Sequence, residues 1–470
     1  MPVLILPNLK WWTSRTFLLV CPFMAKRNRK SVTVGFVALG CPKNVVDSEK
    51  MLAQIAQAGF LVTGDAAQAD VVIINTCGFI EPAKLESLEV IAQAAADKRA
   101  GRIRKIIVAG CLSQRMGRQL LEETEGVDAV VGLEHRDDIV QIVQRTLSSR
   151  GSAVYRKPLS DSVADDRVRL RIGPSHWAYL RISEGCDHRC SFCTIPAIRG
   201  PFRSKPAAQV LDEARELVSS GAVELNLIGQ DTTAYGRDVK AADGLASLLG
   251  EFEQIPDLVW LRLLYAYPTG ITERLIATMA NSDKVVRYLD IPIQHASDKI
   301  LRAMRRPDTR DRLQRMIQDL RAAMSDIVLR TTVIVGFPGE TDEAFSELLD
   351  FVRQAQFDAL GAFTYFAERG TPAAEFPDQV PEEVKQERLD ALMVAQQEIA
   401  FAKNAARLGS RLTCLIDTID EEGTGYGRFY GQAPDIDSVC LVTGCTAAPG
   451  DYTDVRAVGA QDYDLVVEQI

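Results

Sequence analysis

A repeating strand-and-helix pattern between residues 179 and 366 constrains the fold of this 470-residue chain more than any other feature. Six strand-like apolar segments begin 30 to 45 residues apart, which is the length of one β-loop-α-loop unit. They are YLRISEG, ELNLIGQ, LVWLRLLY, YLDIPIQ, LRTTVIVGF and ALGAFTYF. Six units predict a partial (β/α)6 barrel over residues 175–401, with its active site at the C-terminal strand ends, where the strand-to-helix loops gather.

Two further domains are expected on either side of this barrel. Residues 32–155 alternate short β-branched strands with helices beginning near Val45, Pro82, Ser113 and His135, which is typical of a parallel α/β sheet. Residues 156–174 have no clear period and predict a linker. After a long amphipathic helix over residues 381–407, residues 402–470 carry short strands and Gly-rich turns, which predict a small all-β barrel.

Composition narrows the range of partners and compartments. The formal net charge of −9 argues against tight binding of nucleic acid by the chain as a whole and favours a basic protein partner. Ten cysteines are too sparse for a disulfide scaffold, so a reducing, cytoplasmic location is expected. No uncharged apolar run is long enough to span a membrane. Residues 1–31 are interpreted as a dispensable leader with Met24 as a plausible alternative start, and a weak signal anchor is the lesser interpretation.

Cys186, Cys190 and Cys193 form a C-x3-C-x2-C motif directly after the first barrel strand. Three thiolates can hold three irons of a [4Fe-4S] cubane, and the fourth iron is then free to chelate the amino and carboxylate groups of S-adenosylmethionine (SAM). A structural zinc site with His188 as fourth ligand, or plain thiols, is the alternative. The spacing at a barrel strand end favours the cluster.

Three other cysteines obey a common rule. Cys41, Cys77 and Cys111 each follow the C-terminal end of a strand in the predicted N-terminal sheet. Those ends line one crevice, so the three thiols are expected to be neighbours and to hold a second cubane. Taken singly, each would be interpreted as a small buried hydrophobic residue.

The Cys186 motif, with Phe192 before its last cysteine, resembles the signature of the radical SAM superfamily. That resemblance implies that Phe192 lies near the adenine of SAM. The strings GCPKNVVDSE, NTCGFI and AGCLSQR resemble the N-terminal domain of the methylthiotransferase family, which carries a second iron–sulfur cluster. Within that family, LNLIGQDTTAYGRD and YLDIPIQHASDKILRAMRRP resemble the RimO type.

The resemblance implies an enzyme that adds a methylthio group to the β-carbon of an aspartate in small-subunit ribosomal protein twelve. Two [4Fe-4S] clusters and SAM are the implied cofactors, and an external electron donor is required. SAM would serve both as methyl donor to sulfur and as source of the 5′-deoxyadenosyl radical that abstracts the β-hydrogen. The carbon radical would then take a methylthio group held at the open iron of the Cys41, Cys77 and Cys111 cluster.

Two alternatives remain open at this point. The MiaB type modifies isopentenyl adenosine in transfer RNA and resembles this chain in both cysteine motifs. Its members usually carry an asparagine-rich segment where this chain has Asp231–Gly236. A non-catalytic iron–sulfur sensor or binding module would need neither open irons nor SAM.

Several polar residues and glycines are weaker candidates. Gln230 and Asp231 could bind SAM or cap the next helix. Gly336 and Gly339 could admit a close approach of SAM to the backbone or form a turn. The guanidinium groups of Arg203 and Arg330 could each bind a carboxylate through two nitrogens, or could form structural ion pairs. His295 follows a strand end and could belong to the active site, or could be a core or capping residue.

Residues from about 402 onward resemble a TRAM domain, the module that grips substrate in these enzymes. They carry five basic and eleven acidic residues, a balance of −6. Phosphate neutralisation would require the opposite sign, so the sequence favours a basic protein over RNA as the partner of this domain. A solvated acidic face without a partner is the alternative. Cys414, Cys440 and Cys445 are predicted to be structural.

Overall fold

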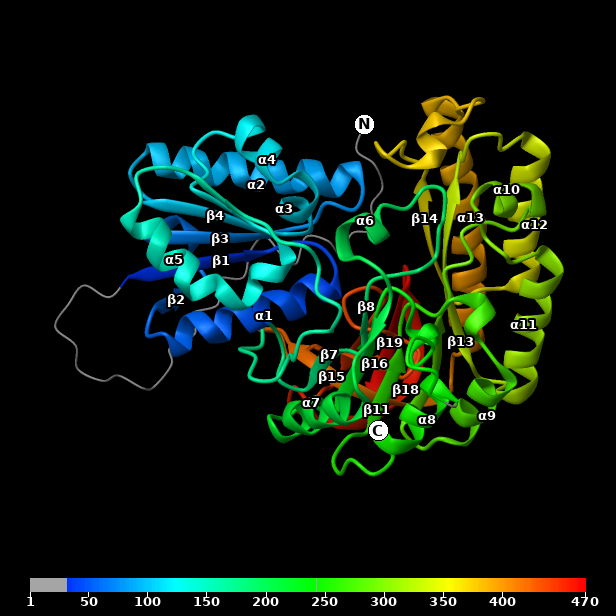
Figure 1. Ribbon diagram of the computed structural model, residues 1–470. Helices are drawn as coiled ribbons and strands as arrows, with labels where there is room; N and C mark the ends of the chain where they lie inside the picture. Colours follow the sequence, from blue (N-terminus) through cyan, green and yellow to red (C-terminus); the bar gives the residue numbers. More distant parts are fainter. Residues whose placement is uncertain (1–31, 242) are drawn as a thin grey trace. The chain divides into compact units, whose positions relative to one another are not determined.

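The computed structural model describes residues 32–241 and 243–470 (Figure 1). The leader predicted for residues 1–31, including Met24, lies outside the described residues. The described chain divides into two compact units. The first runs to Ser160 and includes Val168–Ile172, and the second comprises Asp161–Arg167 and Gly173–Ile470. No helix in the described ranges is long and apolar enough to cross a membrane.

The first unit contains a six-stranded, all-parallel sheet with the order β2-β1-β3-β4-β5-β6. Alternate residues of its strands face opposite sides. Val72 and Ile74 pack against α2, whereas Val71 and Ile73 pack with α1 and α5. Helices therefore cover both faces, which explains why the strands are apolar throughout. The strands are β1 (Thr33–Ala38), β2 (Leu61–Thr63), β3 (Val71–Thr76), β4 (Lys105–Gly110), β5 (Ala129–Val131) and β6 (Ala153–Tyr155).

Three of the four predicted helices of this unit begin slightly earlier than the sequence predicts, and the α-helix predicted near His135 begins later, at Ile139. The helices are α1 (Pro42–Gln57), α2 (Glu81–Arg99), α3 (Cys111–Met116), α4 (Arg118–Glu123) and α5 (Ile139–Ser148). Proline stands in the first turn of α1 and α2, where its missing N–H costs no hydrogen bond. His135 lies in the short 3-10 helix η3 (Leu133–Asp138) that precedes α5. Apolar periodicity locates a helix better than it locates the first turn.

The segment predicted as a linker, residues 156–174, is anchored by its polar groups. Glu49 of α1 receives the backbone N–H groups of Leu170 and Ile172, and its carboxylate pairs with Arg169 at 3.3 Å. Asp166, in the other unit, is buried and binds Arg181. These contacts hold a stretch that has no regular secondary structure.

The second unit contains the predicted six-stranded parallel sheet, with the order β14-β13-β12-β11-β10-β7. Its strands are β7 (Trp177–Arg181), β10 (Glu224–Ile228), β11 (Trp260–Leu263), β12 (Val285–Asp290), β13 (Val328–Val335) and β14 (Ala359–Thr364). Five leucines lie side by side across the sheet and pack under the helices: Leu180, Leu227, Leu263, Leu289 and Leu329. The next residue along each strand faces the opposite side, the barrel interior.

The outer helices of this partial barrel follow their strands in sequence order. They are α7 (Ala207–Ser219), α8 (Gly244–Phe252), α9 (Glu273–Asn281), α11 (Arg310–Ala323), α12 (Asp342–Ala355) and α13 (Glu382–Ala406). Two short helices, α6 (Ile195–Arg199) and α10 (Asp298–Ala303), and the small pair β8 (Ser183–Glu184) and β9 (Arg203–Ser204) lie in the strand-to-helix loops.

Residues 411–469 form a closed five-stranded barrel with the order β15-β16-β17-β19-β18. The strands are β15 (Arg411–Ile419), β16 (Gly425–Phe429), β17 (Cys440–Thr443), β18 (Tyr452–Gln461) and β19 (Asp464–Gln469). β19 pairs antiparallel with β18 and parallel with β17, and so closes the barrel. The predicted fold class, a parallel α/β sheet, a partial (β/α)6 barrel and a small β-barrel, is confirmed.

Buried ion pairs fix the small barrel to the partial barrel within the second unit. Arg428 of β16 binds Glu224, the first residue of β10, at 2.7 Å and Asp417 of β15 at 2.7 Å. Asp417 also contacts His176, which precedes β7, at 2.8 Å. The small barrel therefore attaches at the N-terminal strand ends of the partial barrel, opposite to the strand ends that the cysteine motif follows.

Candidate functional site

The C-x3-C-x2-C motif lies on a tightly folded loop between β8 and α6. Gly185 has a φ of 78°, and a Cβ there would lie 2.0 Å from the carbonyl oxygen of Pro201, so only glycine fits. The loop then turns back, because the N–H of Cys186 donates to the Gly200 carbonyl at 3.1 Å and that of Cys193 donates to Cys190 at 3.2 Å. Cys186, Cys190 and Cys193 are half-buried free thiols.

Burial changes the acidity of two of these thiols. It raises the pKa of Cys186 to about 11 and that of Cys193 to about 12. Both are therefore protonated at neutral pH in the metal-free chain. Since iron binds the thiolate, loading a cluster here must release protons.

His188, inside the same loop, is committed to protein contacts. Its Nε2 lies 2.7 Å from Oδ2 of Asp231, and its ring stacks on Tyr267 with centroids 3.7 Å apart. Arg306 lies over the Tyr267 ring at 3.9 Å. The contact with Asp231 and the stacking on Tyr267 together fix the orientation of the His188 ring.

Asp231 serves as a cap as well as a partner of His188. Its Oδ1 accepts hydrogen bonds from the N–H of Ala234 at 3.1 Å and from the hydroxyl of Thr233 at 2.6 Å, at the start of the short 3-10 helix η4 (Thr232–Ala234). Both carboxylate oxygens are therefore occupied. This geometry favours the capping alternative over direct contact with SAM.

Two buried polar atoms near the loop have no partner among the described residues. Gln230 donates from Nε2 to Glu184 at 3.3 Å, but its Oε1 is buried and unpaired, and so is the hydroxyl of Ser183. Buried polar atoms are usually paired, so a polar ligand or water is expected here. Gln230 and Ser183 thus suit a polar cofactor at the strand ends.

The two candidate glycines follow the end of β13, and Phe192 of the cysteine loop packs beside them. Phe192 packs edge-on to Phe337, with centroids 6.4 Å apart. Gly336 has a positive φ and a Cβ there would lie 2.2 Å from Cγ of Lys385, so packing explains this glycine. Gly339 has a φ of 80° and no atom within 4 Å of its Cβ position, so it leaves open space.

His295 and Arg203 are held by their own neighbours. His295 is fully buried, lies 3.1 Å from Glu340 through Nε2 and accepts the N–H of Ser297 on Nδ1. Arg203 donates to the carbonyl of Arg199 at 2.9 Å. Both behave as structural residues.

The first unit brings its three strand-end cysteines together. A Cβ built at Gly40, next to Cys41, would lie 3.2 Å from Sγ of Cys77. Asn44 donates from Nδ2 to the carbonyls of Leu39 and Thr76, and its Oδ1 lies 3.5 Å from Sγ of Cys111. One amide group therefore touches all three cysteine-bearing segments. Neighbouring thiols at one sheet edge fit a cluster better than three unrelated buried residues.

No group of three or more His, Cys, Asp and Glu side chains in residues 32–241 and 243–470 surrounds one point as a single metal ion requires. A [4Fe-4S] cubane needs a wider spacing of its cysteine ligands than a single metal ion does, because each thiolate binds a different iron. Each cysteine set supplies three thiols, one set from a single loop and the other from three neighbouring strand ends, and three is the donor number that leaves one iron open. The donor chemistry fits iron–sulfur clusters rather than a lone ion.

Three family profiles match the chain in succession. They are the uncharacterized protein family UPF0004 over residues 33–132, the radical SAM superfamily over residues 180–352 and the TRAM domain over residues 408–470. The chain is 46% identical to the ribosomal protein uS12 methylthiotransferase RimO of Geobacter sulfurreducens, over 93% of this chain and 98% of that protein. It is also 46% identical to the protein of the same name from Pelotomaculum thermopropionicum, over 93% and 99%. The chain belongs to the RimO family.

Membership of the RimO family confirms the resemblance drawn from the cysteine motifs and makes the chain a radical SAM enzyme. Among solved structures, the radical SAM methyltransferase TsrM from Kitasatospora setae, with cobalamin and a [4Fe-4S] cluster bound, matches with a TM-score of 0.53 at 16% identity. The match covers 73% of this chain and 74% of TsrM, and it supports the fold alone.

Sequence reasoning missed a buried ionic network beneath the cluster loop of this RimO-family chain. Lys205 is fully buried and binds Asp166 at 2.8 Å and Glu213 at 2.6 Å. Arg181 joins Asp166 to Glu184, which also holds Gln230. A charged residue inside the apolar string YLRIS was the available signal.

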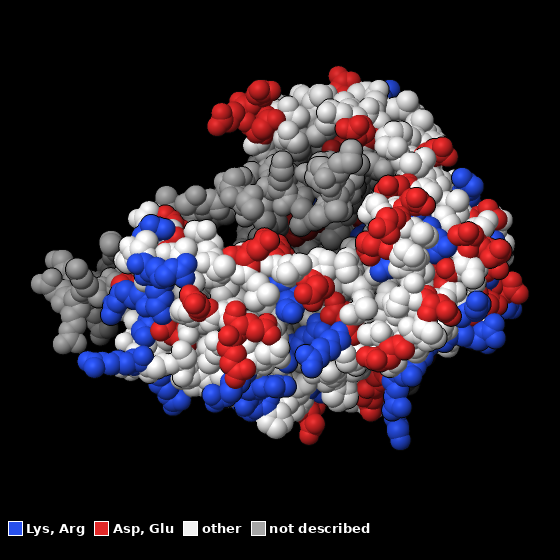
Figure 2. Space-filling model, turned by 90° about the horizontal axis from the view of Figure 1, so that it is seen from above, with Lys and Arg blue, Asp and Glu red and all other residues white. Residues whose placement is uncertain are grey.

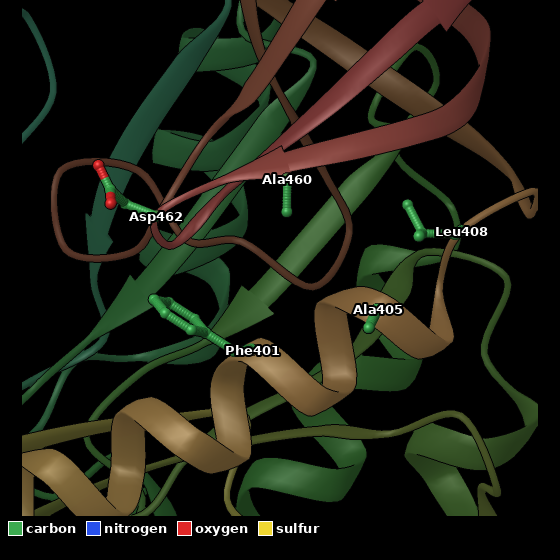
Figure 3. Close-up of a pocket in the computed structure, with 5 residues that line it drawn as sticks. All are labelled: Phe401, Ala405, Leu408, Ala460 and Asp462. Carbon is green, nitrogen blue, oxygen red and sulfur yellow. The ribbon is translucent and has the colours of Figure 1, made fainter.

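A pocket of about 260 Å³ lies far from the cysteine loops in sequence, between the end of α13 and the β18–β19 turn (Figure 3). It is lined by Phe401, Ala405, Leu408, Ala460 and Asp462. Asp462 is the single titratable residue among these five, and none is a cysteine. None of the candidate site residues named above lines this pocket.

Proposed function

We propose that this chain methylthiolates the β-carbon of an aspartate in ribosomal protein uS12. The observation that carries the proposal is the pair of three-cysteine sets, each at the C-terminal edge of its own parallel sheet, in a chain of the RimO family. The curated relatives described above bear the name of uS12 methylthiotransferase, which supports a protein substrate over the transfer RNA of the MiaB type. The radical SAM match supports an enzyme over an iron–sulfur sensor.

In this proposal each cysteine set holds one [4Fe-4S] cluster. Cys186, Cys190 and Cys193 bind the cluster that works with SAM, and Cys41, Cys77 and Cys111 bind the auxiliary one. When bound, and with an electron from an external donor, SAM and the clusters would supply the 5′-deoxyadenosyl radical and the methylthio group. The protein supplies ligation, orientation and a water-poor cavity.

The remaining site residues act on SAM by position. The unpaired Oε1 of Gln230 and hydroxyl of Ser183 offer it hydrogen bonds, and Phe192 offers an apolar surface for the adenine. Gly339 leaves the backbone open, whereas Asp231 and Gly336 act indirectly, by holding His188 and admitting Lys385.

A basic ribosomal protein is the expected partner of the small barrel. Seven acids of residues 402–470 are exposed, against two exposed basic residues, Arg411 and Arg456. The acids are Glu421, Glu422, Asp435, Asp451, Asp454, Asp462 and Glu468. On the face seen in Figure 2, basic and acidic side chains are intermixed. We further propose that an external donor supplies the electron that SAM cleavage requires. Because the proposed substrate is a ribosomal protein, we also propose that the chain acts in the cytoplasm and binds no nucleic acid tightly.

Mass analysis of products tests this function. Reconstituted enzyme with SAM and a reductant should be offered purified uS12 and transfer RNA side by side. The expected product is uS12 in which a methylthio group replaces one hydrogen of an aspartate, with transfer RNA unchanged. The Cys186→Ala variant, checked for an unchanged melting temperature, should form no product. Modification of transfer RNA but not of uS12 would contradict the proposal.

A further inference from the structure

Arg330 lies on the inner wall of the partial barrel. Along β13, Arg330, Thr332 and Ile334 are half-buried, whereas the residues between them are fully buried towards the helices. Ile334 packs in the same apolar cluster as Phe192 of the cysteine loop. Arg330 therefore lies about 13 Å further down the same wall, four residues along one strand.

Two carboxylates flank the Arg330 guanidinium, one through a hydrogen bond and the other through charge alone. Nη1 donates to Asp290 of β12 at 2.8 Å, and Nε lies 3.3 Å from Asp437, which the small barrel supplies. The remaining oxygens of these acids accept hydrogen bonds from neutral donors, the N–H of Tyr265 and the hydroxyl of Tyr288. Burial alone would lower the pKa of Arg330, but the two carboxylates raise it, so the guanidinium stays charged.

The third nitrogen of the guanidinium, Nη2, lies beside Gly361 of β14. It makes no hydrogen bond within the described residues, and neither does the hydroxyl of Thr332. A Cβ built at Gly361 would lie 3.6 Å from Nη2, 3.7 Å from Oγ1 of Thr332 and 3.8 Å from the Phe363 ring. The absence of a side chain at Gly361 thus leaves a gap bordered by a cation, a hydroxyl and an aromatic ring that is 49% exposed.

A guanidinium edge beside a hydroxyl is suited to a carboxylate, which accepts charge-assisted hydrogen bonds. In the proposed function the reacting residue is itself an aspartate, whose carboxylate is bonded directly to the reacting β-carbon. Holding the carboxylate therefore fixes the position of that carbon. We propose that Nη2 of Arg330 and Oγ1 of Thr332 bind the carboxylate of the target aspartate, an inference that rests on the proposed function.

Paired substitutions in enzyme and substrate test this contact. The dissociation constant of SAM-loaded holoenzyme should be measured for native uS12 and for uS12 with the target aspartate changed to asparagine. Wild-type enzyme should bind the asparagine form about tenfold to a hundredfold more weakly, because a hydrogen bond to a charged group is lost. Arg330→Gln should bind native uS12 more weakly by a similar factor and should no longer distinguish the two substrates.

Gly361→Ala gives a second, milder test, because it adds one methyl group in the gap and leaves all charges in place. It should raise the KM for native uS12 and reduce the preference for aspartate. Arg287→Gln is the matched control, since Arg287 is an exposed arginine of β12 paired with Asp326, and it should behave as wild type.

The outcomes separate two kinds of failure. If wild-type enzyme modifies uS12 but both Arg330→Gln and Gly361→Ala keep the full preference for aspartate, the carboxylate contact is wrong and the proposed function stands. If wild-type enzyme cleaves SAM but never modifies uS12, the proposed function fails and this inference fails with it.

Discussion

Asn44 connects the three cysteine-bearing segments of the first unit through a single side chain. Its amide nitrogen donates to Leu39 and Thr76, the residues near Cys41 and Cys77, and its oxygen contacts Cys111. Asn44 is fully buried, and Asn75 donates from Nδ2 to the backbone carbonyl of Asn44 at 3.0 Å. Asn44 therefore preorganises the sheet edge on which the auxiliary cluster is proposed.

Replacing Asn44 with alanine should weaken that edge. The buried carbonyl of Thr76 and the partly buried carbonyl of Leu39 lose their donor, which costs about 1–3 kcal/mol in the free energy of unfolding. We expect reconstituted Asn44→Ala to lose most of the auxiliary iron and to keep the iron bound by Cys186, Cys190 and Cys193. Iron analysis and electron paramagnetic resonance of the reduced clusters measure this. Asn281→Ala, at an exposed asparagine, is the control, and wild-type iron content in Asn44→Ala would show that Asn44 has no positioning role.

At the scale of elements, both cysteine sites were predicted mainly from the positions at which parallel strands end. β1, β3 and β4 each end just before a cysteine, so the rule that such ends share one edge was enough to group Cys41, Cys77 and Cys111. The same rule located the C-x3-C-x2-C loop after β7. Strand identity was readable in the first unit because helices cover both faces of its sheet and its strands are continuously apolar.

Contacts between distant charged residues could not be read from the sequence. Lys205 meets Asp166 and Glu213 because the chain folds them together, and hydrophobic periodicity gives no information on such pairs. The sequence left open whether Arg330 binds a carboxylate ligand or forms a structural ion pair. Which guanidinium nitrogen is left without a carboxylate neighbour depends on Asp437, 107 residues later in the sequence. The sequence likewise could not show whether Asp231 caps the next helix or binds SAM, because the answer depends on where His188 lies in the folded chain.

Because the two proposed clusters lie on separate sheets, removing the cysteines of one cluster should lower the iron content without affecting the other cluster. Reconstituted wild-type enzyme should approach about eight irons per chain, four from each cubane. Changing Cys186, Cys190 and Cys193 to alanine should remove about half of the iron and abolish SAM cleavage. Changing Cys41, Cys77 and Cys111 should remove the other half and leave SAM cleavage in place.

The three cysteines of the small barrel give the matched control for these triple variants. Cys414 and Cys440 are fully buried and Cys445 is half-buried, so their replacement by alanine should cost stability but leave the iron content unchanged. If the variant lacking Cys186, Cys190 and Cys193 kept all its iron, the assignment of that motif would be wrong.

At the scale of the whole molecule, the ion pair between Asp417 and Arg428 holds the small barrel on the partial barrel. Burial alone would raise the pKa of Asp417, but the charge of Arg428 and the hydrogen bond with His176 outweigh it and lower the pKa. Asp417→Asn leaves Arg428 with Glu224 as its remaining carboxylate partner. We expect a loss on the order of 3 kcal/mol in the free energy of unfolding near neutral pH.

This loss should depend on pH in a defined direction. A carboxylate with a lowered pKa in the folded state contributes its full stability above the unfolded value of about 3.9, and loses it as the pH falls through the folded value. The difference between wild type and Asp417→Asn should therefore be constant at neutral pH and shrink below about pH 4. Urea unfolding followed by the fluorescence of Trp260, which contacts Tyr452 of β18, measures it. Asp462→Asn, at an exposed aspartate, is the control, and a difference that grows in acid would contradict the assignment.

The ion pair also changes which acids can meet a substrate, because Asp417 is used internally while Glu421, Glu422 and Glu468 are exposed. If this surface steers a basic ribosomal protein, changing those three glutamates to lysine should slow association with uS12 by roughly tenfold at low salt. The difference should fade as salt shortens the Debye length to about 10 Å at 0.1 M.

The control for charge steering reverses three exposed glutamates of the first unit, Glu122, Glu123 and Glu125, which changes the net charge of the chain equally. Stopped-flow association rates and the rate of uS12 modification should be measured for both variants over a range of salt. Steering by the small barrel requires a slower rate in the first variant and a smaller effect in the second. Equal effects would mean that the overall charge of the chain, rather than the small barrel, attracts the substrate, and no effect in either would leave the acidic surface without a role in binding.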